Sequence, residues 1–387
     1  MNDPVKFLGD SFGTTLLIFM LMLTSNRGSA RNQLASPEEL FRQAQAASRE
    51  KDYVRAEKLY RQVLATDPQV LAARVNLGLA CYWQHKSRAA VGELQKALQV
   101  SPREFSALLF LGLAYIDLGE YDLAQSALQQ AKEVNDKDPL LFWALGSLAM
   151  IHNEANAAIP LLERCTTLDP NNAHCVWLLG QAYAHLAYRQ RAKAPAHYVA
   201  RVEEALRWME ERQPDSALLH VFKGDVLAAR KLTAEALTEY RKALEIDPHW
   251  PDIHLLMGSL LGLLGRWDDA LAELKLQLHD HPDDTRALIE VGSVHCRSGN
   301  YQAAVPILKQ ALARDHNNYE ASYRLGQSYV TLGKHEMAVP LLERATKLNP
   351  EKSDPYYLLY RSYRALKQPE KATAALEQFK RLKSLGS

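Results

Sequence analysis

The chain has few cysteines, almost no net charge and no common catalytic motif, and each shortage excludes a class of protein. Four cysteines in 387 residues are too few for a fold held by a disulfide framework. The 46 basic and 45 acidic residues leave a formal net charge of +1, so we expect no nucleic-acid partner. There is no Walker loop, nucleophile elbow, HExxH or CxxC sequence. The sequence therefore predicts a protein that is not an enzyme and that holds no cofactor and no metal.

Long apolar runs are also missing, apart from one near the start of the chain. Phe12 to Leu23 is apolar, follows Lys6 and precedes the small residues Gly28-Ser29-Ala30. It is short for a membrane span, which needs about 20 apolar residues. We interpret residues 1–30 as a secretory signal peptide and 31–36 as a linker, which predicts a secreted or periplasmic protein. The alternative is a retained N-terminal anchor that holds the rest of the chain at a membrane, outside the cytosol.

The most regular stretch of the chain is the 34-residue segment from Tyr319 to Lys352. Its apolar residues recur at steps of three and four, which is typical of one face of a helix. The Leu332-Gly333 pair divides two such helices, because glycine readily ends a helix. Pro350 closes the second helix, since proline cannot continue the hydrogen-bond ladder. The segment therefore predicts a helical hairpin.

The same frame extends in both directions along the chain. With Tyr319 as position 1, position 8 is glycine in eight units, position 20 is alanine in nine and position 32 is proline in seven. Small residues at positions 8 and 20 let two helices approach closely. This pattern resembles the tetratricopeptide repeat (TPR), a helix–turn–helix unit of the same length. The resemblance implies an all-α fold, a right-handed superhelical solenoid.

Ten units of this frame cover residues 37–386. A solenoid grows by stacking, and each unit contacts its neighbours. No remaining stretch of the sequence is long enough for a separate catalytic domain, which typically needs about 50 residues or more. The units span residues 37–70, 71–104, 105–138, 139–172, 173–216, 217–250, 251–284, 285–318, 319–352 and 353–386.

The fifth unit, 173–216, carries ten extra residues within 185–201. We expect them to lengthen both helices, with Pro195 near the start of the second. The tip of this hairpin contains Arg189, Arg191 and Lys193. One interpretation is a docking spur for an acidic partner; the other is an insertion tolerated at a solvated loop.

The resemblance also implies where a ligand binds. In TPR proteins the first helices line a concave groove, and positions 2, 5, 9, 12 and 13 face it. These positions are apolar and aromatic in units two to five, and Arg and Tyr become frequent in units eight to ten. Exposed apolar patches often mark interaction sites, but aromatic stripes on helices are also typical of a core. The candidate groove residues are Leu79, Tyr82, Trp83, Leu113, Trp143, Met150, Trp177, Arg286, Arg297, Tyr323, Tyr357 and Arg361.

These features favour a non-catalytic scaffold that binds protein or peptide segments of apolar or amphipathic character. The alternative function is an adaptor for assembly of a membrane or cell-envelope complex, if the N-terminal apolar run is retained. The pair Cys165 and Cys175 lies symmetrically about Pro170. In an oxidising compartment the two can form a bridge, and otherwise they are buried thiols. The oligomeric state does not follow from the sequence.

Overall fold

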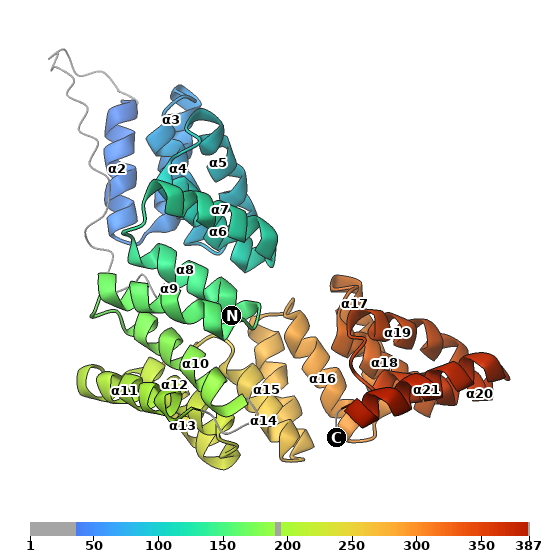
Figure 1. Ribbon diagram of the computed structural model, residues 1–387. Coiled ribbons are helices and arrows are strands. Elements are labelled where there is room, and N and C mark those ends of the chain that lie inside the picture. The colour runs from blue at the N-terminus through green and yellow to red at the C-terminus, as the bar shows by residue number, and fades with distance from the viewer. Residues whose placement is uncertain (1–35, 190–194, 386–387) are drawn as a thin grey trace, which may run out of the picture. The chain divides into compact units, whose positions relative to one another are not determined.

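The computed structural model describes residues 36–189 and 195–385, and all regular structure in these ranges is α-helical (Figure 1). Each of the ten predicted units contains two helices, so the all-α prediction is confirmed. The described residues form two compact units, divided between Arg230 and Lys231. The boundary falls inside the predicted repeat 217–250, between its two helices. Residues 1–30, predicted to be a signal peptide or an anchor, lie outside the described residues.

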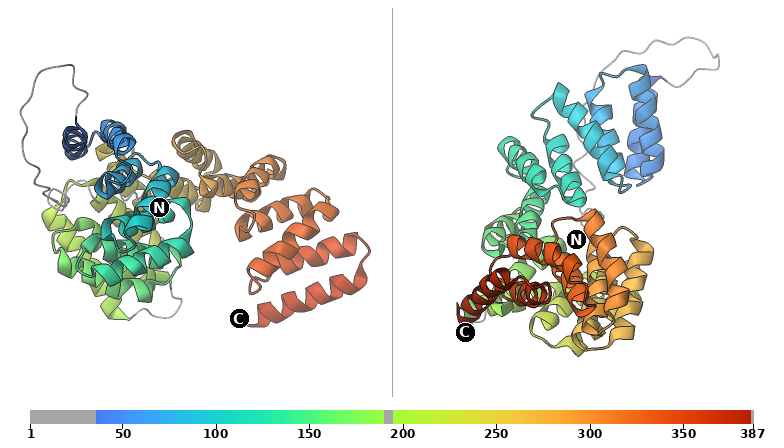
Figure 2. Two further views of the ribbon diagram at one scale, coloured as in Figure 1. Left: turned by 90° about the horizontal axis from the view of Figure 1, so that it is seen from above. Right: turned by 90° about the vertical axis from the view of Figure 1, so that its right-hand side faces the viewer.

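The N-terminal unit is a stack of antiparallel helical hairpins followed by one more helix (Figures 1 and 2). Every second helix packs against the first helix of the next hairpin, as α5 does against α6 and α9 against α10. The helices are α2 (Pro37–Arg49), α3 (Tyr53–Thr66), α4 (Leu71–Tyr82), α5 (Ser87–Val100), α6 (Phe105–Leu118), α7 (Tyr121–Val134), α8 (Pro139–Ile151), α9 (Ala155–Leu168), α10 (Ala173–Arg189), α11 (Ala196–Arg212) and α12 (Ala217–Ala229).

The C-terminal unit begins with a single helix and continues as four hairpins. Its hairpins stack in the same way, with α17 against α18 and α19 against α20. The helices are α13 (Thr233–Ile246), α14 (Ile253–Leu263), α15 (Trp267–Asp280), α16 (Thr285–Arg297), α17 (Tyr301–Arg314), α18 (Tyr319–Thr331), α19 (His335–Leu348), α20 (Asp354–Ala365) and α21 (Pro369–Leu385).

In six repeats the glycine at position 8 is a point of close approach between the two helices of the hairpin. A Cβ atom added to Gly112 would lie 2.6 Å from the side chain of Leu128 on the second helix. The same relationship holds between Gly78 and Leu94, at 2.6 Å. Real Cβ atoms do not approach other atoms so closely. The leucine at position 24 therefore fits in this place because position 8 has no side chain. This contact sets the spacing of the two helices.

A residue with positive φ ends the first helix of most hairpins. Gly333 has φ 73° at this turn, and Gly119 has φ 75° at the equivalent place. Other hairpins place a residue with a side chain there, for example His85 with φ 58°. The left-handed conformation costs roughly 1 to 2 kcal/mol for such residues. The turn of the repeat therefore imposes the left-handed backbone conformation, even where the residue at that position is not glycine.

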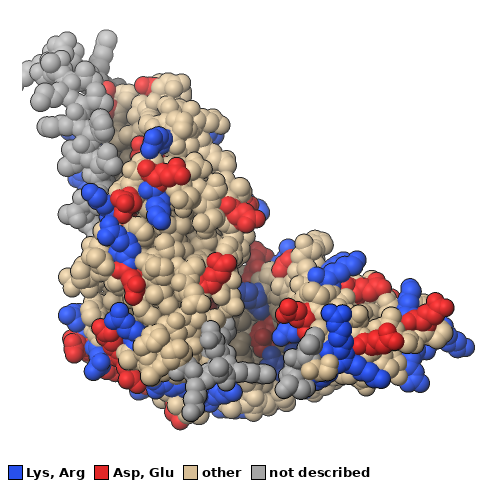
Figure 3. All heavy atoms as spheres, viewed as in Figure 1, with Lys and Arg blue, Asp and Glu red and all other residues tan. Residues whose placement is uncertain are grey.

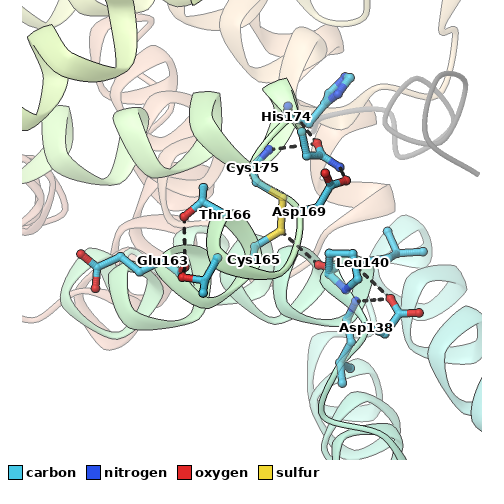
Figure 4. Close-up of a disulfide and its surroundings, with 12 residues drawn as sticks. Asp138, Leu140, Glu163, Cys165, Thr166, Asp169, His174 and Cys175 are labelled. Atoms are coloured by element: carbon cyan, nitrogen blue, oxygen red, sulfur yellow. Dashed lines mark hydrogen bonds between the residues drawn. A yellow bond between two sulfur atoms is a disulfide. The ribbon is translucent and has the colours of Figure 1, made fainter. Parts of the chain in front are cut away.

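A disulfide joins Cys165 at the end of α9 to Cys175 at the start of α10 (Figure 4). Both residues are fully buried, and their Cα atoms lie 5.9 Å apart. The turn around Pro170 folds the second helix of one repeat back against the first helix of the next, which brings the two side chains together. The bridge thus links repeats four and five; Cys81 and Cys296 are buried free thiols.

The extra residues of the fifth repeat lengthen both of its helices, as predicted. Helices α10 and α11 each have 17 residues, and Pro195 is the N-cap of α11. The tip between them, residues 190–194, is outside the described ranges.

Candidate protein-binding site

Four predicted groove residues of the N-terminal unit are buried in the core. Tyr82 and Leu113 are each 1% exposed, Trp177 is 2% exposed and Trp143 is 3% exposed. The expectation that these side chains form an exposed apolar surface is therefore corrected. The first helices pack so closely that large side chains at their groove positions are covered by neighbouring elements. Tyr82, for instance, makes an edge-to-face contact with Phe110 of the next hairpin, with 5.4 Å between ring centroids.

Three other candidates in this unit remain partly exposed: Leu79, Trp83 and Met150. Trp83 stacks on Tyr53 of the preceding hairpin, with ring centroids 5.8 Å apart. It also lies edge-to-face with Phe110, at the same distance. Trp83 thus joins three successive hairpins, and only part of its ring is available to a partner. The apolar surface of this unit is therefore smaller than the sequence suggested. Lys, Arg, Asp and Glu side chains are scattered over its visible face (Figure 3).

The two candidate arginines of α16 are engaged in ion pairs within the chain. Arg286 donates to Asp252 at 2.7 Å and to Asp284 at 3.1 Å. Burial by itself would lower the pKa of Arg286, but these two carboxylates outweigh it and raise the pKa above its ordinary value. Arg297 donates to Glu290 at 2.7 Å. Arg286 therefore connects the turns that precede α14 and α16, whereas the Arg297 pair lies within α16. Each arginine already has a carboxylate partner within the chain.

The remaining candidates, Tyr323, Tyr357 and Arg361, lie on the first helices α18 and α20. Tyr323 is half-buried and stacks on Tyr319, with ring centroids 6.0 Å apart and planes inclined by 6°. Burial, reinforced by the nearby Asp354 carboxylate, raises the pKa of Tyr323. Tyr357 is 43% exposed. Arg361, one helical turn further on, is exposed and forms no ion pair with any described residue.

The predicted spur lies largely outside the described residues. Arg191 and Lys193 lie in the part of the chain that the structure leaves undescribed. Arg189 belongs to the last turn of α10, but its side chain is likewise outside the description. Their role as a docking spur stays a prediction.

A depression beside this hairpin was not predicted from the sequence. It has a volume of about 510 Å³ and lies among α9, α10 and α11. Tyr183 Oη donates to the Glu163 carboxylate at 2.8 Å, and Arg201 lies 5.9 Å from the centroid of the Tyr183 ring. The ten-residue insertion was the signal, because it lengthens α11 and adds side chains there. The lining residues are Asn156, Ile159, Tyr183, His197, Tyr198, Ala200 and Arg201.

Comparison with known families agrees with the hairpin geometry. Models described as tetratricopeptide repeat match residues 41–86, 84–141, 200–250 and 227–288. The chain belongs to the tetratricopeptide repeat family. A further model, described as anaphase-promoting complex, cyclosome, subunit 3, matches residues 297–379. The resemblance to this family that the repeated segments carry is thus confirmed.

Curated relatives of this TPR chain are distant. It is 24% identical over 135 residues to the BBSome complex member BBS4 of Bos taurus, which is 35% of this chain and 26% of the relative. It is 24% identical over 151 residues to anaphase-promoting complex subunit 6 of Arabidopsis thaliana, which is 38% of this chain and 28% of the relative. The chain therefore matches little more than a quarter of the length of either relative.

Solved structures show likeness in fold alone. The Cut9-Hcn1 hetero-tetramer of APC/C is 16% identical, with TM-score 0.46, covering 90% of this chain and 73% of that one. Yeast Tom70 is 13% identical, with TM-score 0.44, covering 89% and 92%. The crystal structure of MamA is 23% identical, with TM-score 0.39, covering 42% and 95%. Among the helices of the described residues, none is long and apolar enough to cross a membrane.

Proposed function

We propose that this TPR protein is a non-catalytic scaffold that binds a segment of a partner protein along α18 and α20. The observation that carries the proposal is the exposed pair Tyr357 and Arg361, one turn apart on the same face of α20. Tyrosine and arginine are over-represented among the residues that dominate binding energy at interfaces. Half-buried Tyr323 extends this surface onto the neighbouring first helix.

The partner segment is amphipathic. The rings of Tyr323 and Tyr357 offer apolar surface, and Arg361 offers a charge that no described carboxylate neutralises. Leu79, Trp83 and Met150 provide the exposed apolar part of the first-helix faces in the N-terminal unit. The names of two curated relatives describe members of multiprotein complexes, which supports a protein as the partner.

Site-specific photocrosslinking tests this proposal. A crosslinking amino acid replaces Tyr357 in the full chain, and a matched variant carries it at Lys347, an exposed residue of the second helix α19. We expect protein crosslinks from position 357, and Tyr323→Ala and Arg361→Ala should reduce them. The same crosslinks should not form from position 347. Equal crosslinking from both positions, unaffected by the two substitutions, would contradict binding by the first helices.

The location we propose is outside the cytosol. The supports are the apolar run Phe12 to Leu23, with small residues at positions 28–30, and the Cys165–Cys175 disulfide. Disulfides persist in oxidising compartments and are rare in the cytosol. Mass mapping of the mature N-terminus tests this, and a mature protein that starts at Met1 would exclude a cleaved signal peptide. Recovery in the membrane fraction would instead favour the anchored adaptor.

The basic tip of the fifth repeat is a separate part of this proposal. Glu in place of Arg189, Arg191 and Lys193 abolishes capture of an acidic partner if the tip is a docking spur. Unchanged crosslinking from position 357 together with unchanged affinity would identify the insertion as a tolerated loop.

A further inference from the structure

The outer face of α21 differs from the corresponding face of every other second helix. In the other nine repeats the residue at position 27 is at most 2% exposed. Most of these residues are small, such as Ala311 and Ala345, because the following first helix packs on them, as α18 packs on α17 and α20 on α19. In the last repeat position 27 is Phe379, which is only half-buried. No other described helix covers it.

Phe379 lies at the centre of an apolar stripe. Leu376, Phe379 and Leu382 are spaced by three residues on α21 and are all half-buried. Tyr357 of α20 borders the stripe, with 5.2 Å between its ring centroid and that of Phe379. We call these four side chains the terminal face. The terminal face is therefore apolar, like the surfaces on which a following helix packs elsewhere in the chain.

The repeat that carries the terminal face has an excess of positive charge. The last repeat, 353–386, has seven basic and three acidic residues, a net charge of +4. Arg364 lies over the Tyr360 ring at 5.6 Å and Lys371 lies over the Tyr363 ring at 5.6 Å, so these cations contact rings rather than carboxylates. Arg361 and Lys380 are exposed and form no ion pair with the residues described.

In two of the preceding repeats, by contrast, an arginine is paired with a carboxylate. Arg266 pairs with Asp269, and Arg314 pairs with Asp283 at 2.8 Å. In Figure 3, Lys and Arg side chains lie beside Asp and Glu side chains at the tip of the C-terminal unit. The last repeat has the largest net positive charge of the ten, and this charge is complementary to an acidic ligand.

We propose that the terminal face binds an acidic amphipathic helix of a partner protein, which stacks on α21 as a first helix stacks on the preceding second helix elsewhere in the chain. The apolar side of the partner helix covers Leu376, Phe379 and Leu382. Its carboxylates lie against Arg361 and Lys380. This surface goes beyond the proposed binding along α18 and α20, because its central residues belong to the second helix.

A pair of synthetic peptides tests the inference with the full chain. Both are amphipathic helices with Leu and Phe on one side; the first carries Glu on both flanks and the second carries Lys. Fluorescence anisotropy should show binding of the acidic peptide, weakened by salt, and no binding of the basic one. Arg361→Glu combined with Lys380→Glu should weaken binding by about tenfold or more, because like charges then oppose each other.

Matched variants separate this surface from the other one. Lys347→Glu, on the exposed surface of α19, and Tyr323→Ala, on α18, should leave affinity for the acidic peptide unchanged. Phe379→Ala should weaken binding of the acidic peptide, and circular dichroism checks that this variant keeps its helix content. Lys380→Glu alone should also weaken binding, and it tests the charge without removing a packed side chain. Absence of acidic-peptide binding, or binding that ignores Phe379 and Lys380, would overturn the inference. Binding of anionic vesicles with the same dependence on these residues would overturn it in favour of a membrane surface.

Discussion

The phenol of Tyr183 donates a hydrogen bond to the carboxylate of Glu163 at 2.8 Å. Tyr363 makes the equivalent bond to Glu343 at 2.6 Å. In both pairs the tyrosine occupies position 11 of a first helix, and the glutamate occupies position 25 of the second helix before it. The bond therefore fastens one repeat to the next and gives a buried hydroxyl its partner.

Tyr329 also occupies position 11, but it lacks this arrangement. Position 25 before Tyr329 is Lys309, whose ammonium lies 6.0 Å from the Tyr329 ring centroid. The Tyr329 hydroxyl is buried and has no hydrogen-bond partner among the described residues. We predict that Lys309→Glu supplies the missing acceptor and stabilises the C-terminal unit by about 1 kcal/mol. Urea unfolding measures this. Lys309→Glu should give no gain in a Tyr329→Phe background, and an equal gain there would contradict the bond.

Two glycines of the second repeat provide a matched test of helix spacing. An alanine Cβ at position 78 would meet Leu94 at 2.6 Å, whereas nothing lies within 4 Å of one at position 92. We predict that Gly78→Ala destabilises the chain by about 1 to 3 kcal/mol through overpacking. Gly92→Ala, inside α5, should stabilise by about 0.5 to 1 kcal/mol, because alanine loses less entropy in a helix. Thermal unfolding followed by circular dichroism measures both, and similar melting temperatures would refute the close approach.

The buried Tyr183 phenol should make stability depend on pH in the alkaline range. Burial, helped by the hydrogen bond to Glu163, raises the pKa of Tyr183 to about 12, from an ordinary value of 10.0. Since the folded pKa is raised, this contribution is complete below the unfolded pKa and is lost as pH rises from about 10 to about 12. Tyr183→Phe should reduce the loss of stability in this window, as measured by urea unfolding at several pH values. An unchanged profile would show that Tyr183 does not titrate there.

The Cys165–Cys175 bridge predicts a defined pattern of thiol labelling. In denaturant without reductant, iodoacetamide should modify the two free thiols, Cys81 and Cys296, and reduction should expose the other two. Because the bridge closes a short loop, its loss should cost about 2 to 3 kcal/mol. The double variant Cys165→Ser, Cys175→Ser should therefore melt at a lower temperature. Labelling of all four cysteines without reductant would show that the bridge is absent.

The sequence alone determined the hairpins. Glycine at position 8, alanine at position 20 and a 34-residue period specify two helices that approach closely, and these requirements are local. For the same reason the lengthened helices α10 and α11 were predictable from an insertion with Pro195 near its end. Local spacing also brought Cys165 and Cys175 symmetrically around one turn, although it left open whether they bond.

Only the tertiary structure decided which side chains a partner can reach. Tyr82 and Tyr357 both occupy positions that face the groove in the TPR register, yet one is 1% exposed and the other 43%. Arg286 and Arg361 both appeared as groove cations, but Asp252 neutralises the first. Exposure and charge pairing depend on neighbours one repeat away, about 34 residues distant in the sequence. A periodic pattern therefore specifies the scaffold, and the packing between repeats selects its binding surfaces.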